Sequence, residues 1–159
     1  MKTRIEQFVR ENNLNYCLEC GKCSAVCPML DFYGEYVYER SPRGVVERLS
    51  LTPDEIENEE GLWYCLACQE CSFLCPSGVN FEGFMTELRD LLLQHGHKKY
   101  AVFCQVCGGY LMPKKAFENF QKILEGGKTG ELLSVCPQCK KNHHVEILHR
   151  LARWPKAKQ

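Results

Sequence analysis

The chain has 159 residues, and its 20 lysines and arginines balance its 20 aspartates and glutamates. This length allows one domain with a small additional module. A net charge of zero argues against a general nucleic-acid-binding protein, for which a basic surface is expected.

The 12 cysteines would indicate a disulfide scaffold in a small secreted protein. Residues 1–7 are polar and charged, however, and lack the apolar segment of a signal peptide. The longest apolar stretch, around Leu91–Leu93, is too short to span a membrane. We therefore expect a cytoplasmic protein without a membrane span, whose cysteines bind metal in a reducing and plausibly anaerobic environment.

The first predicted element is a helix that begins at a capping box formed by Thr3 and Glu6. Its apolar stripe consists of Ile5, Phe8 and Val9. A run of cysteines follows this helix directly.

This run and a second one share the spacing Cys-x2-Cys-x2-Cys-x3-Cys-Pro. The first run contains Cys17, Cys20, Cys23 and Cys27, and the second contains Cys65, Cys68, Cys71 and Cys75. The spacing is typical of cysteines that bind a [4Fe–4S] cluster. Zinc suits it poorly, because zinc takes its four ligands from paired knuckles. The sequence therefore predicts two [4Fe–4S] clusters.

The segment between the runs is predicted to be helical in character. Residues 31–40 are rich in aromatic side chains and contain a glycine, which indicates a loop. Ser41 and Pro42 then begin a helix that extends to about Leu51.

The clearest helix in the sequence follows the second run. Asn80 is its predicted N-cap, and Gly96 stands where the residue after a helix C-terminus belongs. Its apolar stripe more often indicates a core than a binding face, and it comprises Phe81, Phe84, Met85, Leu88, Leu91 and Leu92.

Compact bacterial ferredoxins join their two cysteine runs by short strands, whereas 37 residues of helical character separate the runs here. The chain therefore resembles the α-helical ferredoxins. Three segments (residues 41–46, 61–65 and 75–79) and the pair Leu88-Arg89 also resemble the ferredoxin-like iron–sulfur subunit of heterodisulfide reductase and its relatives. This resemblance covers about residues 1–97.

The resemblance implies both a ligand set and a role. In two-cluster ferredoxins the fourth cysteine of each run binds the other cluster. Cluster one would then be held by Cys17, Cys20, Cys23 and Cys75, and cluster two by Cys65, Cys68, Cys71 and Cys27. Relatives of this kind relay single electrons between a flavin-bearing subunit and a catalytic or membrane partner. In those complexes a different polypeptide reduces disulfides and carries a Cys-Cys pair for this reaction. This chain contains no Cys-Cys pair.

The last third of the chain begins with a predicted strand, Tyr100–Phe103, and includes a predicted helix over residues 114–125. Two Cys-x2-Cys knuckles provide a tetrahedral sulfur site, which suits zinc or a single iron: Cys104, Cys107, Cys136 and Cys139. The pattern resembles a zinc ribbon or a rubredoxin. It lacks the acidic loop and the tryptophan of rubredoxins, which favours zinc, while iron and a third cluster stay open. Lys140, Lys141, His143, His144 and Arg150 are expected to be solvated surface.

The predicted fold class is mainly α, with an α-helical ferredoxin domain over residues 1–97 and a zinc-ribbon or rubredoxin-like α+β module over residues 98–159. The predicted function is that of an electron-transfer subunit, not catalytic on its own, in an oxidoreductase complex with flavin-bearing and catalytic subunits. The alternative is a redox-sensing iron–sulfur regulator or a nucleic-acid-associated zinc-ribbon protein.

Overall fold

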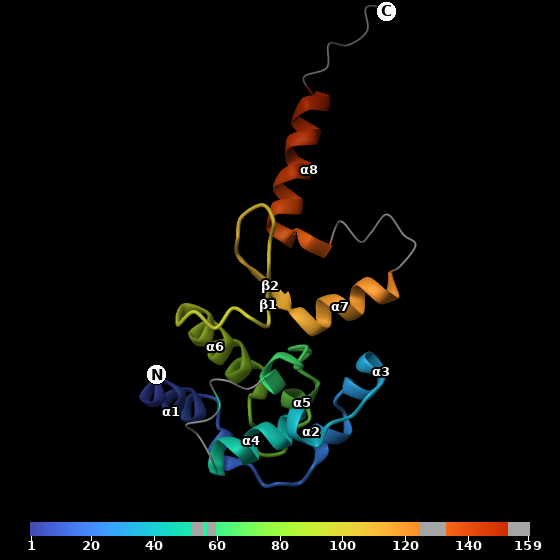
Figure 1. Cartoon of the computed structure of the whole chain (residues 1–159). Coiled ribbons are helices and arrows are strands. Elements are labelled where there is room, and N and C mark those ends of the chain that lie inside the picture. Colours follow the sequence, from blue (N-terminus) through green and yellow to red (C-terminus); the bar gives the residue numbers. More distant parts are fainter. Residues whose placement is uncertain (52–55, 57–59, 125–132, 153–159) are drawn as a thin grey trace, which may run out of the picture.

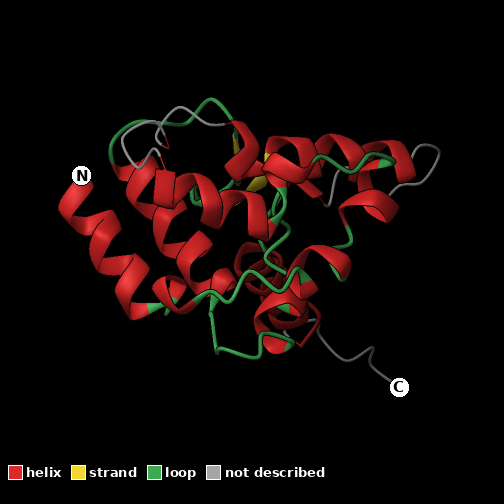
Figure 2. Cartoon of the chain, turned by 90° about the horizontal axis from the view of Figure 1, so that it is seen from below, coloured by secondary structure: helices red, strands yellow, loops and turns green. Residues whose placement is uncertain are grey.

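Residues 1–51, 56, 60–124 and 133–152 are described in the computed structural model of the protein (Figure 1). This part of the chain is mainly helical with a two-stranded sheet, as predicted (Figure 2). Its elements are α1 (Lys2–Glu11), η1 (Leu14–Tyr16), α2 (Lys22–Ala25), α3 (Met29–Tyr33), η2 (Tyr38–Arg40), α4 (Pro42–Leu51), η4 (Glu60–Trp63), α5 (Glu70–Phe73), α6 (Phe81–Gln94), β1 (Ala101–Phe103), β2 (Tyr110–Pro113), α7 (Lys114–Ile123) and α8 (Pro137–Ala152). None of the described helices is both long enough and apolar enough to cross a membrane.

Helix α6 forms the centre of the core. Phe84, Met85, Leu88 and Leu92 have no exposed surface, and Leu62 from η4 is equally buried. The stripe predicted from the sequence is therefore confirmed as core, with Leu91 only partly buried at its edge. The predicted helix ends are also confirmed. The Asn80 side chain accepts a hydrogen bond from the Gly83 N–H at 3.2 Å, and Gly96 has a positive φ of 89°.

The C-terminus of α1 is tied to the N-terminus of α6. The Asn80 N–H donates to the Asn12 carbonyl at 3.0 Å, and the Asn80 side-chain amide donates to Asn12 Oδ1 at 3.0 Å. A Cβ atom on Gly83 would collide with both asparagine side chains, so this contact requires a glycine. The tie brings together the helix before the first cysteine run and the helix after the second.

Two predictions for the N-terminal third are wrong in detail. Helix α1 begins at Lys2, and its N-cap residue is Met1, so Thr3 lies inside the first turn and cannot cap it. Residues 31–40 are not all loop, because α3 continues to Tyr33 and η2 covers Tyr38–Arg40. Gly34, with a φ of 74°, terminates α3 in the left-handed region. The predicted helix after Ser41 is confirmed as α4.

A small hairpin and α7 pack against the helical core. Strands β1 and β2 are antiparallel, and β1 confirms the predicted strand, whereas β2 was not predicted. Tyr110 on β2 makes an edge-on contact with Trp63 at a ring distance of 6.1 Å. Asn119 on α7, within the predicted helix, donates a hydrogen bond to the Phe32 carbonyl. Helix α8 extends away from the rest of the molecule (Figure 1).

Candidate metal centres

The two cysteine runs adopt the same backbone conformation. In the first run Glu19 and Gly21 have positive φ angles of 56° and 75°. In the second run Ala67 and Gln69 occupy the equivalent positions, with φ angles of 52° and 69°. Each left-handed pair leads into a four-residue helix, α2 or α5, and these two helices pack against each other. The runs therefore form two similar loops placed side by side.

One cavity joins cysteines of both runs. It contains about 460 Å³ of empty space including its open mouth, and its cysteines are Cys27, Cys65, Cys68 and Cys71. Three of these belong to the second run and one to the first. Four thiols on one cavity are a donor set that fits an iron–sulfur cluster. We call this space the Cys65 cavity.

A second cavity, with about 440 Å³ of empty space including its open mouth, shows the reverse arrangement. It is lined by three cysteines of the first run and the last cysteine of the second: Cys17, Cys20, Cys23 and Cys75. We call it the Cys17 cavity. Cys71 lines it as well, and so do Pro42 and Phe81, which also line the Cys65 cavity. The two cavities are therefore direct neighbours.

Burial controls the ionisation of these thiols. It raises the pKa of Cys23, Cys27 and Cys65 above the ordinary thiol value, and it raises the pKa of Cys71 to about 12. Cys75 differs, because the Ser77 hydroxyl and nearby backbone N–H groups outweigh its burial and lower its pKa. At neutral pH the buried thiols therefore become thiolates only when a cation is present to compensate the charge.

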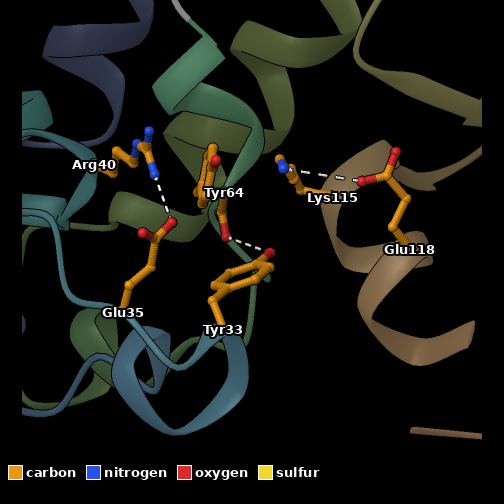
Figure 3. Close-up of polar contacts among 6 residues, drawn as sticks. All are labelled: Tyr33, Glu35, Arg40, Tyr64, Lys115 and Glu118. Atoms are coloured by element: carbon orange, nitrogen blue, oxygen red, sulfur yellow. Dashed lines mark hydrogen bonds and ion pairs between the residues drawn. The ribbon is translucent and has the colours of Figure 1, made fainter. Parts of the chain in front are cut away.

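Polar and aromatic side chains surround the rim of the Cys65 cavity. Arg40 lines the cavity, stacks on the Tyr64 ring at 4.0 Å and forms an ion pair with Glu35 at 2.9 Å (Figure 3). The Tyr33 hydroxyl donates to the Tyr64 carbonyl at 3.0 Å (Figure 3). These contacts fix the chain directly before Cys65.

The C-terminal cysteines form a separate site. The Sγ atoms of Cys104, Cys107, Cys136 and Cys139 all lie within 4.8 Å of one another. The Cys107 and Cys136 sulfurs are 3.8 Å apart. Four sulfurs arranged as a tetrahedron around one zinc ion, each with a Zn–S bond of about 2.3 Å, lie about 3.8 Å apart. The distance between the Cys107 and Cys136 sulfurs matches this value. No histidine belongs to this group.

Two separate segments of the chain, each carrying one Cys-x2-Cys knuckle, form this site. Gly108, with a φ of 69°, makes the predicted tight turn after the first knuckle. The second knuckle lies at the start of α8, where Pro137 occupies the first helical position. The Gln105 N–H donates to the Ser134 carbonyl at 3.0 Å and so joins the segments that carry the knuckles.

The four C-terminal thiols cannot all ionise by themselves. Backbone N–H groups, foremost that of Cys136, lower the pKa of Cys104 to about 6. Hydrogen bonding to the Cys136 sulfur raises the pKa of Cys139 to about 12. The group therefore combines a Cys104 thiol that ionises readily with a Cys139 thiol that resists ionisation. A divalent cation would allow all four to bind as thiolates.

Comparison with known families agrees with this geometry. Residues 13–79 match the family of the 4Fe-4S dicluster domain, and they include all eight cysteines of the two runs. The match supports a [4Fe–4S] cluster and a role in electron transfer. A search of curated proteins finds no match to the chain.

Sequence reasoning did not assign Arg40 or Arg89 to the surroundings of the Cys65 cavity. Arg89 is buried beside this cavity, and its position shows a signal that could have been used. It lies four residues after Met85 and three before Leu92, so helical periodicity places it on the buried face of α6.

Proposed function

We propose that this chain is an electron-relay subunit that carries two [4Fe–4S] clusters with exchanged ligands. Cluster one is bound by Cys17, Cys20, Cys23 and Cys75, and cluster two by Cys65, Cys68, Cys71 and Cys27. The observation that supports this most directly is that each cavity contains three cysteines of one run and the last cysteine of the other, with Cys71 as an additional lining residue of the Cys17 cavity.

The surroundings of the cavities suit one-electron transfer. The clusters, when bound, supply sites that accept and release single electrons. The cavities share lining residues, which favours passage of an electron from one cluster to the other. The buried Phe81 lines both cavities and gives each of them an apolar wall.

We further propose that two parts of the chain have different roles. Residues 1–97 hold the clusters, and residues 98–159 form a zinc-binding module that docks onto a partner. In the reducing cytoplasm the partners are the flavin-bearing and catalytic subunits of an oxidoreductase complex similar to heterodisulfide reductase. The proposal of zinc rests on the four closely spaced sulfurs.

Metal analysis of anaerobically reconstituted protein tests the proposal. We expect about eight irons and one zinc per chain, because each cubane contains about four irons. A reduced flavoprotein should bleach the visible absorption of both clusters in a stopped-flow experiment. Four irons or fewer after full reconstitution would refute the two-cluster assignment, and clusters that no flavoprotein reduces would refute the relay.

The distribution of charge favours a second candidate, because the neutral total hides a strong asymmetry. Residues 1–97 contain eight lysines and arginines against sixteen acidic residues, whereas residues 98–159 contain twelve against four. The basic C-terminal segment could bind an anionic surface on the partner protein or a nucleic acid. Salt-dependent binding of labelled duplex DNA and single-stranded RNA at physiological ionic strength would favour the nucleic-acid-associated regulator. Absence of such binding would favour the relay subunit.

A further inference from the structure

Arg89 places a permanent positive charge inside the N-terminal core. Its exposed fraction is 4%, and it belongs to α6, whose neighbouring buried residues are apolar. Lysines and arginines are almost never buried to this degree unless they are paired. Arg89 is therefore expected to have a negatively charged partner.

The polar contacts of Arg89 are all with neutral groups. Its Nε donates to the Leu62 carbonyl at 3.1 Å, and its Nη2 donates to the carbonyls of Leu62 at 2.5 Å and Cys65 at 2.7 Å. The guanidinium also faces the Trp63 ring at 5.6 Å. Within the described part of the chain, no ion pair joins Arg89 to a carboxylate. A buried cation without a negative partner is strongly unfavourable.

The Cys65 cavity offers the missing negative charge. Arg89 binds the carbonyl of Cys65, one of the four cysteines that line this cavity. A [4Fe–4S] core bound by four thiolates is an anion, and each reduction adds one negative charge. The field of a buried cation is poorly screened, and it therefore stabilises the reduced cluster more than the oxidised one.

Among the residues described, the cationic side chains that line the Cys17 cavity are the exposed Lys22 and one arginine. This arginine, Arg43, is paired with Glu19 at 3.0 Å. The Cys65 cavity has its own paired arginine, since Arg40 is neutralised by Glu35 at 2.9 Å. Arg89 is therefore the buried cation beside the Cys65 cavity that has no ion pair, and the lining of this cavity also includes the carboxylates of Glu70 and Glu82.

We propose that Arg89 is the buried counter-charge of cluster two and raises the reduction potential of this cluster. This inference rests on the proposed function, because it requires a cluster in each cavity. Arg89 touches no iron ligand atom and is a positioning residue that acts through its field and through the Cys65 carbonyl.

Redox titration monitored by EPR tests this proposal with three variants. Arg89→Gln removes the charge and keeps some hydrogen-bonding capacity. Arg89→Lys keeps the charge and loses the planar fork. Arg40→Gln is the matched control, because its charge is already neutralised by Glu35. A Cys17→Ser variant, which lacks a ligand of cluster one, identifies which signal belongs to cluster two.

We expect Arg89→Gln to shift the potential of cluster two in the negative direction, by more than the Arg40→Gln control does, and to leave cluster one unchanged. The shift should persist at high ionic strength, since salt does not screen a buried charge effectively. Arg89→Lys should retain most of the original potential.

The outcomes separate this inference from the proposed function. Full iron content with no shift of cluster two in Arg89→Gln would overturn the inference and leave the relay intact. Fewer than two clusters in the wild-type protein would refute the relay itself. If Arg89→Gln fails to retain cluster two, Arg89→Lys decides. Retention of cluster two in the lysine variant supports the charge role, and its loss there would show that Arg89 serves only to hold the turn at Leu62–Cys65.

Discussion

The N-terminal part and the C-terminal segment both gather cysteines, but they differ in what else supports the cysteines. The cavities of the N-terminal part rest on a core in which Leu62, Phe84 and Leu88 are completely buried. The C-terminal site connects a short hairpin to α8, along which Val145, Leu148 and Leu151 remain 41–62% exposed. Bound metal would therefore add to an existing fold in the first case and would take the place of a core in the second.

The largest effect is expected from the cysteines that exchange between the runs. Cys75→Ser should remove cluster one and reduce the iron content from about eight to about four per chain, because the Cys17 cavity loses its fourth ligand. Cys27→Ser is the reciprocal control and should empty the Cys65 cavity instead. EPR identifies the cluster that remains. Loss of the cluster bound by the second run in Cys75→Ser would contradict the exchange.

Cys136→Ser should affect only the C-terminal segment. Without a complete set of four sulfurs the metal is lost, and α8 loses its connection to the first knuckle. Hydrogen exchange of the α8 amides should become much faster, while the EPR signals of both cubanes stay unchanged. Unchanged protection of α8 in this variant, or in the wild type after treatment with a zinc chelator, would show that the helix does not depend on the metal.

A pair of leucines compares the two regions without touching any ligand. Leu88→Ala in α6 should lower the free energy of unfolding by about 2–5 kcal/mol, because it leaves a cavity in a packed core. Leu148→Ala on α8 should change it by less than about 0.5 kcal/mol, because that side chain is 49% exposed. Denaturant unfolding of the cluster-loaded protein measures both. Equal effects would contradict the difference in packing.

The smallest expected effect concerns the helix start. Asn80→Ala should lower the free energy of unfolding by about 1–2 kcal/mol, since it removes the cap of α6 and the amide contact with Asn12. The control is Asn142→Ala on α8, where the asparagine only accepts an exposed hydrogen bond from Gln138. Thermal unfolding should distinguish the two variants. A midpoint for Asn80→Ala that equals the wild-type value would show that the tie between α1 and α6 contributes nothing.

Local rules were sufficient to predict α6. Its cap, its apolar periodicity and its terminal glycine act within the helix itself, and the structure confirms all three. Strand β2 was missed, because Tyr110–Pro113 lacks an alternating pattern and is defined mainly by its pairing with β1. Helix α8 was missed because its apolar residues are scattered among basic ones and bury against nothing described.

The candidate sites show the same limit. Spacing predicted that each run binds metal, but only a resemblance indicated which cysteines combine across the two runs, because spacing within a run contains no information about the other run. The burial of Arg89 depends on the turn at Leu62–Cys65, which lies 24 or more residues away in sequence. Contacts over such distances are determined by tertiary packing rather than by local pattern.

The matching backbone of the two loops has a consequence for the direction of electron flow. Left-handed residues occur at Glu19 and Gly21 in one loop and at the corresponding Ala67 and Gln69 in the other. The backbone of the two loops therefore has approximate twofold symmetry. A symmetric backbone does not determine at which cavity an electron enters and at which it leaves. The direction of electron flow must then be determined by the side chains around the two cavities. A few substitutions around the cavities could reverse the current through this protein without altering its architecture.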